Sequence, residues 1–263
     1  MTDDPPAVPP DRERLLHELL TPAVHARQAV LAAHLFALYR GVVAAGPFQG
    51  LALLPDIAWG VGDTAAKLVG LYEAELHPAL RALAADPPPA VVNVGCAEGY
   101  YAVGLARLFP EAVIYAFDVD PNAQRICRLT AELNGVSDRV SVLGGCVPQL
   151  LFSLLGQYPA ALLVIDCEGC ELELLSDMVM AGATRAHLII ECHDFIDPAI
   201  TATLAARLAA SHQVEVIQEG ARNPNHLEPL RRLSSLDRWL VVLEHRPSAM
   251  CWIAARPRAA ASR

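Results

Sequence analysis

From residue 90 onward the chain alternates short β-branched runs with segments of helical periodicity, and this alternation constrains the fold more than any other feature. Strands are predicted at 90–95, 112–117, 139–143, 160–165, 187–192, 213–218 and 250–255. Strands that alternate with helices form a mostly parallel sheet with helices on both faces. The sequence therefore predicts an α/β, Rossmann-like fold for this part of the chain.

A helical section precedes these strands. Leucine and valine recur at helical spacing over 11–20 and again over 24–43, and Pro22 is expected to separate the two helices. A third helix is predicted at 65–84. The proline run that follows, at 87–89, marks the expected boundary between the helical section and the sheet domain.

This boundary divides the chain into three parts: a helical section at 1–87, a Rossmann-like domain at 88–257 and a disordered tail at 258–263. We expect the helical section and the less regular segment at 224–246 to form a substrate pocket or a subunit contact. A homodimer through the N-terminal helices is one such arrangement.

Composition and charge exclude several classes of protein. The chain is 54% hydrophobic, and its net charge of −9 comes with no dense stripe of lysine and arginine, which disfavours a nucleic-acid partner. The acidic, proline-rich start lacks the pattern of a secretory signal. Glycine, proline and aspartate interrupt the apolar run at 42–61, so no membrane span is predicted. We expect a globular, cytoplasmic protein.

Seven cysteines are scattered through the predicted strands and helices. An odd, scattered set is not typical of a disulfide framework, so all seven are expected to be thiols in a reducing compartment. Cys167 and Cys170 form a CxxC pair, but neither a second pair nor two histidines at metal spacing accompany them. The sequence therefore disfavours a zinc site.

The first turn between strand and helix carries small residues at Gly95, Ala97 and Gly99. Such a turn lets the backbone approach a ligand closely at the carboxyl end of the sheet. Asp118 lies 23 residues after Gly95, close to the spacing of about 20 at which an acidic residue binds ribose hydroxyls. Together these residues predict a site for a nucleoside-containing cofactor.

Two cofactor classes fit a Rossmann-like turn. NAD favours the pattern GxGxxG, whereas the small residues here fall as GxAxG. Glu98 also lies within the turn, where it would repel a pyrophosphate and tolerate a sulfonium or ammonium group. S-adenosylmethionine is therefore favoured over NAD. A Rossmann-like domain that binds no cofactor is a further alternative, because glycines can serve the turn alone.

Three segments carry a family resemblance: VVNVGCAEGYYAVGLARLFPEAVIYAFDVDP, LLVIDCEGCELELL and LIIECHDF. Over 91–195 the chain resembles the FkbM-type branch of class I S-adenosylmethionine-dependent methyltransferases. The resemblance implies a seven-stranded sheet whose last strand, at 250–255, is antiparallel. It also implies that Asn93, Gly95 and Gly99 line the methionine half of the cofactor, Asp118 the ribose, and Gly145 and Cys146 the adenine. The full set of candidate cofactor residues is Asn93, Gly95, Ala97, Glu98, Gly99, Asp118, Val119, Gly145, Cys146 and Asp166.

Two positions depart from the family pattern. Asn93 stands where an acidic residue is usual, and it cannot neutralise the ammonium group of the cofactor. Glu98 could take over that charge. Ala97 replaces a common glycine, a change that the family tolerates.

Polar residues follow the fourth and fifth predicted strands, which end at the same edge of the sheet. Methyl transfer from sulfur is an in-line displacement, so an enzyme mainly aligns the donor and the acceptor and supplies a base where one is needed. Asp166 and His193 are the candidate bases, and Glu191 completes the predicted catalytic set.

The same region could instead hold a divalent cation. Asp166, Glu191 and Asp194 offer oxygen ligands of the kind that Mg²⁺ binds, and His193 is a further possible ligand. The arrangement is similar to that of metal-dependent O-methyltransferases of small phenols and sugars. A bound cation would lower the pKa of the acceptor hydroxyl.

Four nearby residues have simpler interpretations. Glu171 is expected to complement the dipole of the following helix, and Glu173 is expected to be solvated. Glu73 and His77 are expected to lie on a solvated helix face rather than near the methionine end of the cofactor.

The sequence thus predicts an S-adenosylmethionine-dependent methyltransferase that acts on the oxygen of a small-molecule or sugar-like acceptor. A catalytically silent Rossmann-like protein that binds the cofactor is the main alternative. An NAD-dependent oxidoreductase is the second alternative.

Overall fold

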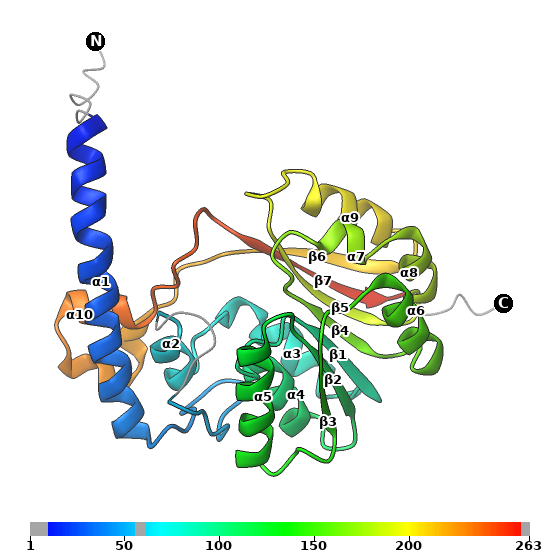
Figure 1. Cartoon of the computed structure of the whole chain (residues 1–263), viewed down its shortest axis with the longest axis horizontal. Helices are drawn as coiled ribbons and strands as arrows, with labels where there is room; N and C mark the ends of the chain where they lie inside the picture. The colour runs from blue at the N-terminus through cyan, green and yellow to red at the C-terminus, as the bar shows by residue number, and fades with distance from the viewer. Residues whose placement is uncertain (1–9, 56–61, 259–263) are drawn as a thin grey trace.

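Figure 1 presents the fold as a computed structural model that describes residues 10–55 and 62–258. Of the expected tail at 258–263, only Arg258 is among the described residues. Of the apolar run at 42–61, the last six residues, 56–61, lie outside them. The described part of that run is a loop closed by a bridge between Val42 and Ala52.

A seven-stranded sheet forms the centre of the molecule, in the order β3-β2-β1-β4-β5-β7-β6. Its strands are β1 (Ala90–Val94), β2 (Val113–Phe117), β3 (Val140–Leu143), β4 (Leu162–Ile165), β5 (His187–Cys192), β6 (His212–Gln218) and β7 (Cys251–Pro257). The pairs from β3 to β5 are parallel, whereas β7 runs antiparallel to both β5 and β6. The predicted Rossmann-like sheet with an antiparallel last strand is confirmed.

Strand β1 illustrates why these runs form inner strands. All five of its residues are buried, as expected for a parallel strand with helices on both sides. Val91 contributes to the apolar core on one face, and Val92 and Val94 contribute to the core on the other. This alternation follows from the two-residue period of a strand.

Helices cover both faces of the sheet (Figure 1). Helices α4 and α5 pack near β1, β2 and β3, and α9 packs against β6 and β7. The helices that follow β1 to β5 are α4 (Tyr100–Leu108), α5 (Pro121–Leu133), α6 (Pro148–Gln157), α7 (Glu171–Leu174), α8 (Asp177–Gly182) and α9 (Ile200–Leu208). The strand order reverses direction at β1 and β4, so the carboxyl ends of these strands flank a crevice where a ligand can bind.

The N-terminal section begins with a single helix, α1 (Pro10–Tyr39), so the predicted separation at Pro22 is wrong. Proline removes one helical hydrogen bond, but Pro22 is exposed, and the carbonyl it leaves free lies on the projecting half of the helix. The second half is anchored by Gln28, whose amide donates to Leu240 O and Leu243 O. These hydrogen bonds fix the second half of α1 to the segment before β7, and the helix continues through Pro22.

The predicted helix at 65–84 is divided into α2 (Thr64–Val69), a 3₁₀ turn at Ala74–Leu76 and α3 (His77–Leu83). Gly70 ends α2 with a left-handed φ of 72°, a conformation that favours glycine. The prediction of one helix was wrong because leucine periodicity continues across this break.

The segment at 224–246 contains two 3₁₀ turns, Pro224–His226 and Glu228–Arg232, and helix α10 (Ser235–Val241). Helix α1 packs against both α2 and α10, so the N-terminal section and the segment before β7 meet beside the sheet (Figure 1). Arg27 of α1 pairs with Asp237 of α10 at 2.7 Å. Among the described helices, none has both the length and the apolar character needed to cross a bilayer.

Candidate active site

A cavity of about 640 Å³ opens at the carboxyl ends of the parallel strands. This volume lies within the range of about 300 to 1,000 Å³ that is usual for small-molecule sites. Eight of the ten predicted cofactor residues line it: Gly95, Ala97, Glu98, Asp118, Val119, Gly145, Cys146 and Asp166. The cavity therefore gathers residues from the ends of β1, β2, β3 and β4.

The other two predicted residues lie beside the cavity. Asn93 is buried in β1, and its amide donates to Val164 O at 3.4 Å. Gly99 precedes α4, where an added Cβ would approach Cys127 Sγ at 3.0 Å, so it serves the packing of α4 on α5.

The turn after β1 brings its backbone against that of β4. Gly95 has a φ of 80°, and an added Cβ would lie 1.7 Å from the carbonyl oxygen of Asp166. The Gly95 amide donates to Phe117 O at 2.8 Å, which ties the turn to β2 as well. Only glycine allows this close approach of three strand ends.

Asp118, at the end of β2, is held with both carboxylate oxygens accepting backbone protons. Ala97 N donates to Oδ2 at 2.8 Å, and Asp120 N donates to Oδ1 at 2.9 Å. A carboxylate oxygen has a second lone pair, so each can still accept a hydroxyl proton from a ribose. Ala97 itself has a left-handed φ of 44°, and strain of this kind is found at ligand sites.

Glu98 lines the cavity but is buried and paired with Lys67 of α2. Burial alone would lower the pKa of Lys67, but the charges of Glu98 and Asp63 outweigh that effect and raise it. Glu98 was expected to neutralise the ammonium group of the cofactor, but its negative charge is already paired with Lys67.

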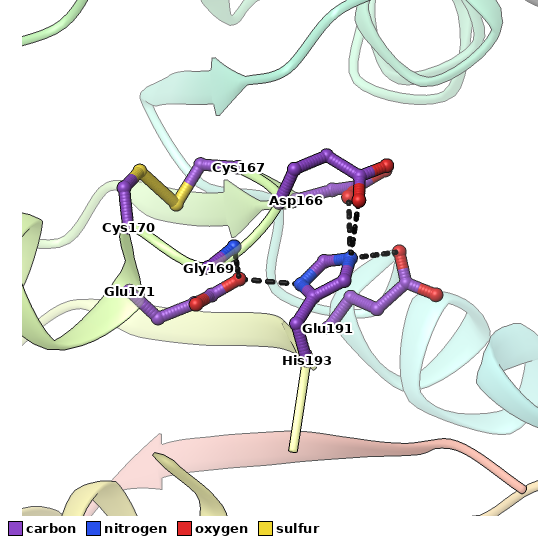
Figure 2. Close-up of a disulfide and its surroundings, with 8 residues drawn as sticks. Asp166, Cys167, Gly169, Cys170, Glu171, Glu191 and His193 are labelled. Atoms are coloured by element: carbon purple, nitrogen blue, oxygen red, sulfur yellow. Dashed lines mark hydrogen bonds and ion pairs between the residues drawn. A yellow bond between two sulfur atoms is a disulfide. The ribbon is translucent and has the colours of Figure 1, made fainter. Parts of the chain in front are cut away.

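His193 lies at the centre of an acidic cluster, which Figure 2 shows beside the turn that follows β4. Its Nδ1 atom lies 2.5 Å from Oε1 of Glu171. Its Nε2 atom faces the carboxylates of Asp166, Glu168 and Glu191 at 3.6, 3.4 and 3.9 Å. The structure therefore brings together all three predicted catalytic residues, Asp166, Glu191 and His193.

The electrostatics of this cluster favour protonation. Burial and the neighbouring charge of Glu191 raise the pKa of Asp166 well above its ordinary value. Burial by itself would lower the pKa of His193, but the hydrogen bond with Glu171 and the surrounding carboxylates raise it. Perturbed groups that share a cavity are typical of sites that move protons.

Three side chains of the cluster could share a metal ion. Asp166, Glu191 and His193 each offer a ligand atom, and these atoms all lie within 4.8 Å of one another. Asp194, the third predicted metal ligand, is not among them. Its carboxylate accepts from Thr201 N at 2.9 Å and from Thr201 Oγ1 at 2.6 Å.

Arg246 connects the acidic cluster to the N-terminal section. Its guanidinium pairs with Glu191, with Glu73 at 3.0 Å and with Glu244 at 2.8 Å, and it stacks 4.7 Å above the Trp252 ring. The crowding of acidic groups raises the pKa of Glu73 to about 8, with burial as the main cause.

The far side of the cavity is formed by the N-terminal section and the segment before β7. His25, Asp63 and Tyr72 line it from the first, and Glu244, His245 and Arg246 from the second. The cavity is therefore lined by segments that come before and after the parallel strands in the sequence.

Cys167 and Cys170 form a disulfide, so the prediction that all seven cysteines are thiols is wrong. A tight turn brings the two Cα atoms to 5.5 Å, within the usual range for a disulfide. Both cysteines line the cavity, and the turn they close contains Glu168 with a left-handed φ of 54°. The other five cysteines are free.

Sequence reasoning missed the part that Glu171 and Glu73 play in the site. Glu171 lies in the first turn of α7 as predicted, but it is completely buried beside His193. Glu73 and His77 are buried, so the prediction that they lie on a solvated helix face is wrong. The Glu73 carboxylate accepts from Arg246, which is 173 residues away in the sequence. Only the spacing of Glu171 within DCEGCE, directly after β4, offered a signal.

No protein-family model matches this chain, and no curated protein matches its sequence. Solved structures do match. Cofactor-bound Rv0187 from MTB has a TM-score of 0.50 at 13% identity, with 97% of this chain and 100% of that chain covered.

A second match is the O-methyltransferase TomG from Streptomyces achromogenes, in complex with SAM, with a TM-score of 0.50 at 12% identity and coverage of 88% and 90%. The O-methyltransferase from Bacillus cereus in complex with SAH has a TM-score of 0.47 at 14% identity, with coverage of 68% and 78%. At these identities the likeness bears on the fold alone. The structural neighbours of this chain are class I S-adenosylmethionine-dependent methyltransferases, and its fold is the Rossmann-like fold of that class.

Proposed function

We propose that this chain is an S-adenosylmethionine-dependent methyltransferase that methylates an oxygen of a small-molecule or sugar-like acceptor. The observation that carries the proposal is a single cavity. It joins a nucleoside-type half, with Gly95 and Asp118, to a proton-accepting half centred on His193. The FkbM-type resemblance of 91–195 and the fold of the O-methyltransferase neighbours support the same activity.

Two features of the turn suit the cofactor. Gly95 places only backbone at the point where a side chain would meet Asp166. Each carboxylate oxygen of Asp118 accepts one backbone proton and keeps a second lone pair, which can accept from a ribose hydroxyl. Val119, Gly145 and Cys146 would then flank the adenine. When bound, S-adenosylmethionine supplies an electrophilic methyl group on a positively charged sulfur, which suits a cavity lined by more carboxylates than cations.

The protein's own part is to orient the acceptor and to accept its proton. Nε2 of His193 faces the cavity, so it is the proposed base, and Asp166 and Glu191 would stabilise the imidazolium that forms. His25, Tyr72 and His245 would contact the acceptor from the opposite wall and exclude water.

The experiment is release of S-adenosylhomocysteine from S-adenosylmethionine in the presence of a panel of hydroxylated small molecules. An active acceptor identifies the substrate class. His193→Ala should then lose activity by about 100-fold or more. His187→Ala, at the other end of β5, is the matched control and should keep it. Equal activity of wild type and His193→Ala would refute the role of this base.

A metal-assisted route is the second candidate, favoured by the ligand atoms of Asp166, Glu191 and His193 within 4.8 Å. Carboxylate and imidazole ligands suit Mg²⁺, Mn²⁺ or a related ion. Calorimetric titration with Mn²⁺ should give binding that Asp166→Asn abolishes. Turnover that survives chelation, with no response to added Mg²⁺ or Mn²⁺, would eliminate this route.

The other predicted alternatives have weaker support. A silent cofactor-binding protein would bind the donor and lose nothing but stability on Asp166→Ala. NAD is disfavoured by the spacing of the turn more than by Glu98, whose charge Lys67 neutralises. A homodimer through the N-terminal helices, a cytoplasmic location and the lack of a nucleic-acid partner stay predictions. The four exposed leucines of α1, at 15, 16, 19 and 20, are compatible with a dimer, which sedimentation would detect.

A further inference from the structure

Glu171 is the most deeply buried carboxylate of the site, and methyl transfer as proposed gives it no role. Its side chain is completely buried, whereas Glu173, two residues later on the same short helix, is exposed. A buried carboxylate is costly unless hydrogen bonds compensate for the lost water. Its contacts therefore indicate what it does.

The carboxylate of Glu171 uses one oxygen for two contacts. Oε1 accepts from the backbone amide of Gly169 at 3.1 Å and lies 2.5 Å from Nδ1 of His193. Oε2 is buried without a hydrogen-bond partner among the described residues. An ionised carboxylate can only accept hydrogen bonds, so the donor of the second bond is Nδ1–H of His193.

The two nitrogens of His193 therefore have different surroundings, as Figure 2 shows. Nδ1 points to Glu171, away from the cavity, and Nε2 points toward Asp166, Glu168 and Glu191. In a neutral imidazole only one nitrogen carries a proton, and the hydrogen-bond partners of the ring decide which one it is. With Nδ1 donating to Glu171, Nε2 keeps its lone pair.

We propose that Glu171 is a positioning residue that holds the proton of neutral His193 on Nδ1, so that the Nε2 lone pair faces the cavity. This inference rests on the proposed function, which needs that lone pair. In the base route, Nε2 takes the hydroxyl proton while the acceptor oxygen bonds to the methyl carbon and the sulfur–carbon electron pair stays on sulfur. In the metal route, the same lone pair would bind the ion, and Glu171 would orient the imidazole through its hydrogen bond with Nδ1.

Both partners are held by their own backbone. Glu171 follows the turn closed by the Cys167–Cys170 disulfide, and it begins α7. The carbonyl of His193 accepts from the amides of Ile196 at 2.8 Å and Asp197 at 3.2 Å. The pair is thus built into two fixed turns, at the ends of β4 and β5, rather than formed between mobile side chains.

The test is ¹⁵N NMR of histidine side chains in the full chain without any ligand, at an alkaline pH where the ring is neutral. His193→Gln identifies the His193 signals by their loss. In wild type, Nδ1 should give the shift of a protonated nitrogen and Nε2 that of an unprotonated one. In Glu171→Gln, whose amide can donate to Nδ1, the Nε2–H form should increase. Glu173→Gln is the matched control and should leave the His193 signals unchanged.

A wild-type His193 with its proton on Nε2 would overturn the proposal, and so would identical His193 shifts in wild type and Glu171→Gln. If Glu171→Gln does not fold, the wild-type shifts decide. With an acceptor that wild type methylates, Glu171→Gln should reduce turnover about 10- to 100-fold without loss of S-adenosylhomocysteine binding. The NMR result needs no cofactor, so failure of the proposed function, seen as no cofactor binding to wild type, is a separate outcome.

Discussion

Replacement of Gly95 by alanine tests the turn on which the cofactor site depends. The new Cβ would lie 1.7 Å from Asp166 O, far inside van der Waals contact, and the backbone of β4 cannot move alone. Asp166 N donates to Val94 O at 2.9 Å, and Cys96 N donates to Phe117 O at 2.9 Å. Relief of the clash must therefore disturb hydrogen bonds among β1, β2 and β4.

The magnitude follows from two effects. A non-glycine residue held at a φ of 80° costs roughly 1–2 kcal/mol. Each backbone hydrogen bond that is lost costs about 1 kcal/mol. With two or three bonds affected, Gly95→Ala should lower the free energy of unfolding by about 3–5 kcal/mol. That is a large part of the roughly 5–15 kcal/mol that stabilises a typical domain.

The assay is urea denaturation followed by circular dichroism, together with calorimetric titration with S-adenosylhomocysteine. Gly156→Ala is the matched control, because Gly156 lies in α6 with nothing within 4 Å of an added Cβ. It should stabilise by about 0.5–1 kcal/mol. A free energy of unfolding for Gly95→Ala within about 1 kcal/mol of wild type, together with equal binding of S-adenosylhomocysteine, would refute the predicted clash.

Three further predictions concern the charges and cysteines. Asp118→Ala should weaken S-adenosylhomocysteine binding by about 10- to 100-fold, since hydrogen bonds to a charged group contribute roughly 1.5–3 kcal/mol. Asp138 is exposed, so Asp138→Ala is the control and should bind as wild type does in the same titration. Folding raises the pKa of Glu73 from 4.5 to about 8. The protonated carboxyl therefore contributes its full share of stability below pH 4.5, and this stability is lost as the pH rises through about 8. Urea denaturation from pH 5 to 9 should therefore show wild type losing stability relative to Glu73→Gln, by up to about 1.4 kcal/mol per pH unit, and parallel curves would contradict it. Alkylation of the denatured, unreduced chain should modify five cysteines, and reduction should expose all seven; seven modified cysteines without reduction would refute the disulfide.

Local sequence patterns predicted most of the sheet and half of the site. Strands such as 160–165 are continuous apolar runs with clear ends, and parallel strands bring their carboxyl ends to one edge whatever their pairing order. The meeting of Asp166, Glu191 and His193 follows from that geometry alone. It needs no knowledge of side-chain contacts.

The rest depended on contacts between distant parts of the chain. Glu73 is buried because Arg246 and Tyr101 reach it, and nothing near Glu73 in the sequence reveals either partner. Glu171 lies in the first turn of α7, a place typical of helix-dipole residues, but the fold sets His193 against it. Pro22 was misjudged for a similar reason, since the packing of α1 on α2 and α10 overrides the local preference.

The central claim is that the cavity above β1 and β4 binds S-adenosylmethionine, and calorimetric titration of the full chain tests it most directly. The titrants are S-adenosylmethionine, S-adenosylhomocysteine and NAD, each added to wild type. We expect the first two to bind at one site and NAD to give no heat of binding. Binding of NAD without binding of S-adenosylmethionine or S-adenosylhomocysteine would contradict it, and so would the absence of any binding.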